Sequence, residues 1–470
     1  MTLPICENCA NYNDRVCSAG HAEIMRRRNE PGWYCQHFVT LETAMALDTP
    51  AVIVVPKEYE GMTLERYKEN HIKKWLYIDP KDDEVIDVIV SVALDRELPG
   101  EPIWIFVIGP PGATKTELVR AFHGSRFYTT SSITAHTLIT GLKDKSAKDL
   151  LPELDGKVLI IKDFTTTLTD ENELAEILSQ LREAYDGYME MNFGSGVGKK
   201  SYKSKFGLIA CVTPIIDAYV TVQNLLGERF IKIRMRTDRK KSAQKAMENA
   251  GKEDQMREEL RFATCALLDE ATRRIANVKE IKIPEEIESK ILELAIFTAT
   301  ARSGVHRDRQ HYMTILPEAE IGTRLAKQLK KLAQALTIIR GKDNVGNAEF
   351  QTVLRVALDS IPKKRMKILG AFFTEKQPDP NAATKQSTLA EDNTKGQVFT
   401  SRDISQAVKA PTATTTEALE DLWSLGLVIR HGEDKNFSWE LEPDTIEAMD
   451  KSGILSCATQ SRQANTEINI

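Results

Sequence analysis

A short segment rich in glycine and proline, residues 109–116, ends in a lysine and a threonine. It follows the apolar run Trp104–Ile108, which predicts a strand buried on both faces, and it precedes an expected helix. Between a strand and a helix, such a loop presents backbone N–H groups to phosphate. We expect Lys115 to reach the β- and γ-phosphates of ATP and Thr116 to hold Mg²⁺. The residues expected to bind the nucleotide are Gly109, Pro110, Pro111, Gly112, Ala113, Thr114, Lys115 and Thr116. The alternative is a Gly/Pro-rich turn with no ligand.

Polar residues also follow or precede the other expected strands. Asp163 comes after the apolar run Val158–Ile161 and Lys162, where it would complete a magnesium site. Thr213 follows the run Gly207–Val212 and could sense the γ-phosphate. A general base must polarise the attacking water, and Glu183 is the candidate, although a solvated helix carboxylate is an equal alternative.

Arg229 stands just before a further expected strand, residues 230–235. An arginine at this place suits an arginine finger that acts on a neighbouring subunit. The alternative is a surface salt bridge.

The elements that must position these residues alternate between strand and helix over residues 101–241, which predicts an α/β fold with a parallel sheet. Residues 83–98 and 171–185 read as helices. The remaining divisions are a Cys-rich segment at 1–40, an N-terminal linker region at 41–100, an all-α lid at 242–373, a linker at 374–396, a small domain at 397–445 and a disordered tail at 446–470.

The ordered set of residues resembles the AAA+ ATPases, and most of all the MCM-type replicative helicases and related phage or mobile-element ATPases. Thr114 replaces the glycine before the phosphate-loop lysine, as in that group. Residues 181–184 and 225–230 resemble its Leu-x-Glu-Ala and arginine-finger segments, and residues 323–329 resemble its lid helix. The resemblance implies a hexameric ring that hydrolyses ATP, acts as a replication-associated DNA helicase or translocase, and uses Arg324 to sense nucleotide.

One position departs from that group, because Phe164 follows Asp163 where those enzymes have glutamate. This departure motivates one alternative to a DNA motor, an ATP-gated DNA-binding module with little turnover. A MoxR-like ATPase that remodels proteins is a second alternative, because the lids of such proteins look similar.

Residues 189–207 predict a hairpin with its turn at Gly194–Gly198. Four lysines would load one side of it with positive charge: Lys199, Lys200, Lys203 and Lys205. In helicase-type AAA+ proteins a hairpin at this place points into the channel of the ring. Its lysines would bind single-stranded DNA through phosphates, without sequence specificity. The alternative is a solvated basic loop.

Four cysteines lie within the first forty residues: Cys6, Cys9, Cys17 and Cys35. A Cys-x2-Cys pair with two more distant cysteines is typical of structural zinc, and an iron–sulfur cluster is the alternative. Zinc would stabilise a segment that has few aliphatic residues.

Residues 397–445 predict two helices, Ser401–Val408 and 412–425, followed by a hairpin. This is a winged-helix pattern. The second helix carries acidic residues, so a protein partner or an autoregulatory contact is as good an expectation as DNA.

The net charge of −5 argues against a protein that coats nucleic acid with its whole surface. The sequence shows no signal peptide and no apolar run long enough to cross a bilayer. We therefore expect a cytoplasmic protein with no membrane contact.

Overall fold

The structure is a computed structural model of the 470-residue chain. It describes residues 12–13, 16–17, 55–112, 114–134, 136–142, 148–169, 171–194, 197–219, 229–278, 280–308, 310–374, 397–432 and 437–455. The chain divides into two compact units, Met1–Val54 and Val55–Ile470. In the first unit, β1 (Tyr12–Asn13) pairs antiparallel with β2 (Val16–Cys17).

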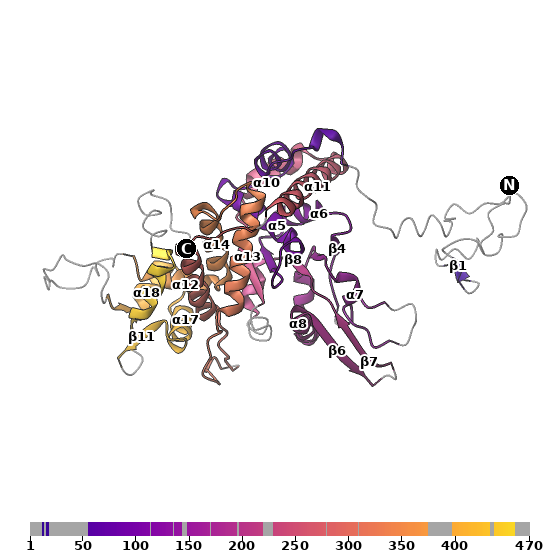
Figure 1. Cartoon of the computed structure of the whole chain (residues 1–470). Coiled ribbons are helices and arrows are strands. Elements are labelled where there is room, and N and C mark those ends of the chain that lie inside the picture. Colours follow the sequence, from indigo (N-terminus) through magenta and orange to yellow (C-terminus); the bar gives the residue numbers. More distant parts are fainter. Residues whose placement is uncertain are drawn as a thin grey trace, which may run out of the picture. The chain divides into compact units, whose positions relative to one another are not determined.

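The second unit is built on a five-stranded sheet in the order β4-β5-β8-β3-β9. Figure 1 labels two of its strands, β4 and β8. Its strands are β3 (Trp104–Ile108), β4 (Phe127–Thr130), β5 (Val158–Ile161), β8 (Gly207–Val212) and β9 (Phe230–Arg234). Every neighbouring pair is parallel, which confirms the predicted α/β fold with a parallel sheet. All residues of β3, β5 and β8 are buried, as their continuous apolar runs predict.

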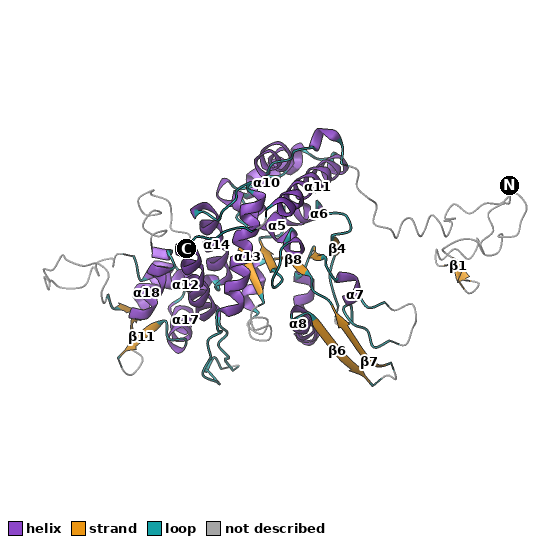
Figure 2. Ribbon diagram, in the orientation of Figure 1, coloured by secondary structure: helices purple, strands orange, loops and turns teal. Residues whose placement is uncertain are grey.

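Side chains of β3 point alternately into two apolar clusters, one on each face of the sheet. Trp104 and Phe106 belong to the cluster that also contains α8 (Glu171–Tyr185). Ile105 and Val107 belong to a larger cluster that contains α5 (Asp83–Ala93) and most of the later helices. Figure 2 shows helices flanking the strands of this sheet.

Residues 55–100, which the sequence places in a linker region, are part of this larger cluster. They form α3 (Leu64–Arg66), a π-helix (Tyr67–Ile72), α4 (Lys73–Trp75) and α5. The side chains of Tyr67, Trp75 and Val88 are buried in the same cluster as the sheet residues Ile105 and Val107. These residues therefore belong to the fold of the sheet.

After the sheet, the described residues up to 374 are mainly helical, as predicted. The helices are α10 (Arg239–Glu248), α11 (Glu253–Asn277), α12 (Glu285–Arg302), α13 (Thr323–Ile339), α14 (Asn347–Ser360) and α15 (Lys363–Ala371). The single helix predicted over residues 242–277 is divided in two, because α10 ends at Glu248 and α11 begins at Glu253. Gly251, with a φ of +81°, lies in the turn between them. The predicted linker at 374–396 lies outside the described residues except for Thr374.

The C-terminal part contains β10 (Phe399–Thr400), α16 (Ser401–Val408), α17 (Thr412–Ser424), β11 (Val428–His431), β12 (Ser438–Leu441) and α18 (Pro443–Lys451). The three strands pair in the order β10-β12-β11. The two helices and the hairpin match the predicted pattern. The disordered tail predicted from residue 446 is wrong up to residue 455, because α18 buries Met449 in the core and the chain then buries Ile454 there too. Within the described residues, no helix is long and apolar enough to cross a membrane.

A buried ion pair fastens α13 to the sheet. Lys331 Nζ lies 2.7 Å from Asp95 Oδ1, and the two side chains are 4% and 0% exposed. Asp95 also accepts a hydrogen bond from the backbone of Ile103, just before β3, at 2.9 Å. Burial raises the pKa of Asp95 and lowers the pKa of Lys331, so each charge depends on the other.

We predict that Lys331→Met lowers the free energy of unfolding by about 3–5 kcal/mol, because it leaves the Asp95 carboxylate buried without a cation. Urea unfolding measures the change. The control is Lys330→Met, whose exposed pair with Glu288 is worth less than about 1 kcal/mol. Equal losses in the two variants would contradict the prediction.

Candidate functional site

The predicted phosphate loop connects β3 to α6 (Lys115–Arg120). Gly112 and Thr114 both have positive φ angles, +78° and +48°, in the left-handed region. Glycine reaches that region freely, whereas a β-branched residue is strained there. The loop conformation therefore explains why other loops of this kind have glycine at the position of Thr114. Ala113 lies outside the described residues.

Lys115 is the cation of this loop, and its side chain is buried. Its ammonium donates hydrogen bonds to the carbonyl oxygens of Gly109 (2.6 Å) and Pro110 (2.8 Å). Burial lowers the pKa of Lys115, and the nearby charge of Asp163 acts in the opposite direction. A desolvated ammonium held by two neutral carbonyls gains energy from an anion, so the residues present fit a bound phosphate.

Two further predicted residues lie at the same edge of the sheet, because β5 and β8 are adjacent and parallel. Asp163 follows β5 with its side chain exposed, and its Oδ1 accepts a hydrogen bond from Thr165 N at 2.9 Å. Thr213 follows β8, and its N–H donates to Thr165 Oγ1 at 3.1 Å. Thr165 thus links the two strand ends. The sequence prediction missed Thr165, whose only signal is its place two residues after Asp163.

Phe164 follows Asp163 directly in the sequence, and its side chain is completely buried. Its ring lies 5.3 Å from the ring of Phe106 in β3. A side chain at this place packs into the core of the sheet. Residue 164 therefore cannot contribute a base to the phosphate edge.

The structure does not bring Glu183 to this edge. Glu183 is exposed in the last turn of α8, next to Tyr185. The hydroxyl of Tyr185 donates to Pro102 O at 3.0 Å, so this end of α8 lies where β3 begins. Glu183 is thus at the opposite end of the sheet from Asp163 and cannot serve as the base in its own chain.

Arg229 and Arg324 form a pair at the end of the sheet where the strands begin. Their guanidinium carbons lie 5.6 Å and 5.7 Å from the centre of the Tyr185 ring. Burial, together with the charge of Arg324, lowers the pKa of Arg229. The sequence predicted each arginine but not that they share one aromatic side chain.

One face of α13 holds this arginine pair in place. Gln328 Nε2 donates to Arg229 O at 2.7 Å, one turn after Arg324. Glu320 lies 3.6 Å from Arg324 and also accepts from the buried Arg302 at 2.9 Å. Together with the Lys331 ion pair described above, these contacts fix Arg324 beside Arg229.

The arginine pair is far from the phosphate loop of its own chain. β3 and β9 pair with Trp104 opposite Phe230 and Ile108 opposite Arg234. Arg229 precedes this register by one residue and Gly109 follows it by one, so six residue steps, about 20 Å, separate them along the sheet. Arg229 and Arg324 therefore face away from Lys115 within one chain. The role of Arg324 as a nucleotide sensor stays a prediction.

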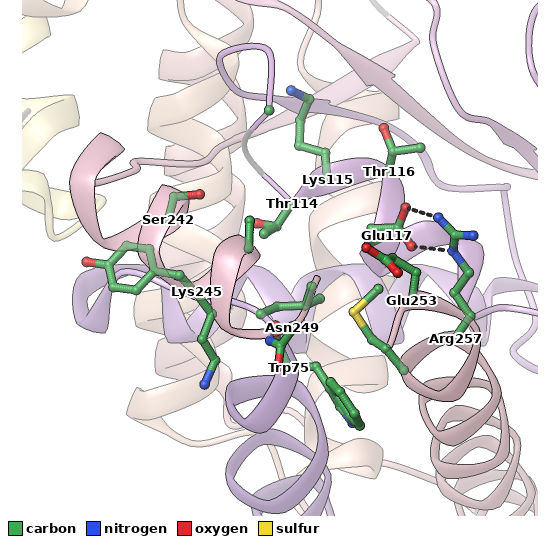
Figure 3. A pocket seen from close by; sticks show the side chains of 15 residues that line it. Trp75, Thr114, Lys115, Thr116, Glu117, Ser242, Lys245, Asn249, Glu253 and Arg257 are labelled. Atoms are coloured by element: carbon green, nitrogen blue, oxygen red, sulfur yellow. Dashed lines mark hydrogen bonds and ion pairs between the residues drawn. The ribbon is translucent and has the colours of Figure 1, made fainter. Parts of the chain in front are cut away.

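A cavity of about 340 Å³ adjoins the phosphate loop (Figure 3). Its lining residues include Thr114 and Thr116 of the loop region and the aromatic residues Trp75 and Tyr77. Residues of α10 and α11 complete it, including Arg257, which binds Glu117 through two hydrogen bonds of 3.1 and 3.2 Å. The wall has aromatic surface beside polar groups, which suits a flat heterocycle next to the phosphate site.

The predicted hairpin is formed by β6 (Tyr188–Phe193) and β7 (Gly198–Lys203). Its lysines do not share one side, because successive side chains of a strand point to opposite faces. Lys200 is half-buried and donates to Thr140 O and Asp149 Oδ2, both at 2.8 Å. Tyr202, on the same face, donates to the same carboxylate at 2.7 Å.

Lys199 and Lys203 point to the other face of the hairpin. Lys199 forms an exposed ion pair with Glu190 at 2.8 Å. Lys203 is exposed, and no ion pair is found for it in the described part of the chain. Lys205 follows β7 and lies 3.9 Å from Glu101. Of the four lysines, Lys199 and Lys203 are therefore the pair that one phosphate chain could contact together.

The acidic face of α17 is occupied by arginines of the same chain. Arg307 contacts Asp421 at 2.8 Å and Glu420 at 3.3 Å. Arg365 of α15 also contacts Asp421, at 3.3 Å. This face is thus an intramolecular docking surface. Of the predicted zinc ligands, Cys6, Cys9 and Cys35 lie outside the described residues and Cys17 is described only as part of β2, so zinc stays a prediction.

No protein-family model matches the chain, and no characterised protein is significantly similar to it in sequence.

We predict that Thr114→Gly raises the free energy of unfolding by up to about 1 kcal/mol. The substitution removes roughly 1–2 kcal/mol of strain that the left-handed backbone conformation imposes on threonine in the folded protein. It also costs about 0.4–1 kcal/mol, because glycine increases the conformational entropy of the unfolded chain. Thr114→Ala keeps a Cβ atom and is the matched control, with no gain expected. The prediction fails if the glycine variant unfolds at a lower denaturant concentration than the alanine variant.

Proposed function

We propose that the chain is an ATP-hydrolysing subunit of a AAA+ ring that moves on or unwinds single-stranded DNA. The observation that carries the proposal is the convergence of Lys115, Asp163 and Thr213 at one edge of the sheet. The strand order adds support, because β8 stands between the phosphate-loop strand β3 and the acidic strand β5. Thr213, which follows β8, therefore lies between the ends of the other two strands.

In this proposal, the loop from Gly109 to Thr116 binds the phosphates of ATP, with Lys115 as the cation. The cavity beside Trp75 and Tyr77 takes the base. Thr116 and Asp163 would hold Mg²⁺, which neutralises charge on the phosphates. Thr213 is the polar group that responds to the γ-phosphate.

A neighbouring subunit completes the site. Arg229 and Arg324 are held rigidly, yet they lie at the wrong end of the sheet for their own nucleotide. In a ring, the sheet edge where the strands of one subunit begin could face the phosphate loop of the next subunit. Arg229 and Arg324 of the first subunit would then reach the nucleotide bound by the second. A hexamer is the assembly that the resemblance implies.

DNA contact through the hairpin rests on Lys199 and Lys203, with Lys200 bound to Asp149 as a support of the hairpin. The C-terminal helices and hairpin are proposed to form a winged helix. Its acidic helix α17 is already engaged by Arg307 and Arg365, which favours an autoregulatory contact over DNA binding by this face. The Cys-rich segment is proposed to bind zinc.

An ATP-gated module with little turnover is the second candidate. It is favoured by the buried Phe164 and by the distance of Glu183 from Asp163. Neither residue 164 nor Glu183 therefore provides a carboxylate that could polarise the attacking water at the phosphate loop of its own chain. This candidate predicts tight ATP binding and negligible phosphate release.

Subunit mixing tests the proposal. Lys115→Ala is expected to abolish ATP binding, whereas Arg229→Ala is expected to retain binding and lose at least about 10³-fold in turnover. Mixed in equal amounts, the two inactive variants should recover part of the wild-type phosphate release, because some interfaces pair an intact loop with an intact arginine.

Single-stranded DNA should stimulate phosphate release by the wild type, and Lys199→Ala/Lys203→Ala should reduce that stimulation. Lys57→Ala, an exposed lysine far along the chain from the hairpin, is the control. Tight ATP binding without turnover, with or without DNA, would favour the second candidate. No ATP binding at all would exclude both.

A further inference from the structure

A second cavity, of about 530 Å³, lies where β9 ends and α14 and α15 pack. It contains neither Lys115 nor Asp163, and none of the hairpin lysines lines it. Its wall instead carries six cationic side chains, which are Arg234, Arg236, Arg239, Arg355, Lys363 and Lys367. In a chain of net charge −5, such a concentration of positive charge is a local feature.

Two of these cations build the wall. Arg234 forms a two-pronged ion pair with Asp217, with N–O distances of 2.7 and 2.8 Å. Arg355 contacts the buried Asp82 at 2.6 Å. Their charges are balanced inside the protein, so they shape the cavity without being available to a ligand.

The other four cations are exposed. The backbone N–H of Arg236 donates to Asp82, but its guanidinium lies 4.0 Å from that carboxylate. For Arg239, Lys363 and Lys367, no ion pair is found in the part of the chain that the structure describes. Lys363 and Lys367 are one helical turn apart and therefore lie on the same face of α15.

The carboxylate that lines the cavity is already engaged. Asp359 Oδ2 accepts a hydrogen bond from Arg234 N at 2.8 Å, and the side chain lies 3.9 Å from Arg355. Asp359 thus contacts the balanced pair of arginines, and within the described residues no ion pair joins it to any of the four exposed cations. Like charges held together in this way repel one another, and a polyanion removes that repulsion.

We propose that this cavity binds the phosphate backbone of a nucleic acid. The exposed cations come from two separate elements, the segment 236–239 and α15, so one strand could place successive phosphates against both. Arginine and lysine bind phosphate by charge and carry no sequence information in doing so. The binding is therefore expected to be independent of sequence and strongly dependent on salt.

The site borders the phosphate loop, because Pro110 lines the same cavity. A strand bound here would contact the first turn of that loop. Any effect of nucleic acid on nucleotide affinity must be matched by an equal effect of nucleotide on nucleic-acid affinity. The proposal itself does not depend on ATP hydrolysis or on the hairpin.

The test is fluorescence anisotropy of a labelled single strand of mixed sequence, titrated with the full chain at several salt concentrations. Arg239→Gln/Lys363→Gln should weaken binding about tenfold or more in 0.1 M salt and reduce the slope of log K against log salt by about 1.4. Arg273→Gln/Lys290→Gln makes the same change in net charge on an exposed cation of α11 and a half-buried cation of α12, and it should bind like the wild type. Thermal unfolding checks that all variants fold.

A labelled duplex forms the second arm and shows which form of nucleic acid is preferred. Lys199→Gln/Lys203→Gln separates this site from the hairpin. The proposal is overturned if the hairpin variant loses all binding while Arg239→Gln/Lys363→Gln loses none, or if the wild type binds no nucleic acid. It is also overturned if polyglutamate competes as well as the oligonucleotide, since the site then serves acidic protein segments.

Discussion

All five strands of the sheet run in one direction, and this constraint decides which functional residues can meet. Whatever follows a strand lies at one edge, and whatever precedes a strand lies at the other. Lys115, Asp163 and Thr213 follow their strands and converge. Arg229 precedes its strand and lies at the far edge, about a strand's length away. The two groups of residues in the proposed nucleotide site are thus carried at opposite edges of the same sheet.

Helix α13 holds Arg229 and Arg324 in a fixed position. Its exposed start carries Arg324, the next turn binds the backbone of Arg229 through Gln328, and Lys331 reaches the buried Asp95. A buried ion pair contributes little net stability, but it penalises any arrangement that separates its partners. The pair therefore specifies the position of α13, and with it the distance between the two arginines. Preorganised charge of this kind is what stabilises a phosphoryl-transfer transition state.

The sequence predicted the elements whose signals are local. The runs 104–108, 158–161 and 207–212 gave strands with the observed bounds, because continuous apolar runs in this setting are buried strands. β4 was missed, since only Phe127 of its four residues is buried. The places of Glu183, Arg324 and the hairpin lysines could not be predicted, because they depend on helix length, on tertiary contacts and on strand register. The cation cavity beside α15 joins residues more than a hundred positions apart, which no local pattern reveals.

The central claim is that one subunit supplies the phosphate loop and the next supplies Arg229 and Arg324. The most direct measurement is the structure of the full chain assembled with a non-hydrolysable ATP analogue. The account predicts a closed ring in which both arginines of one subunit lie within hydrogen-bonding distance of the γ-phosphate bound at Lys115 of its neighbour. A nucleotide-bound monomer, or a ring in which both arginines face solvent, would contradict it.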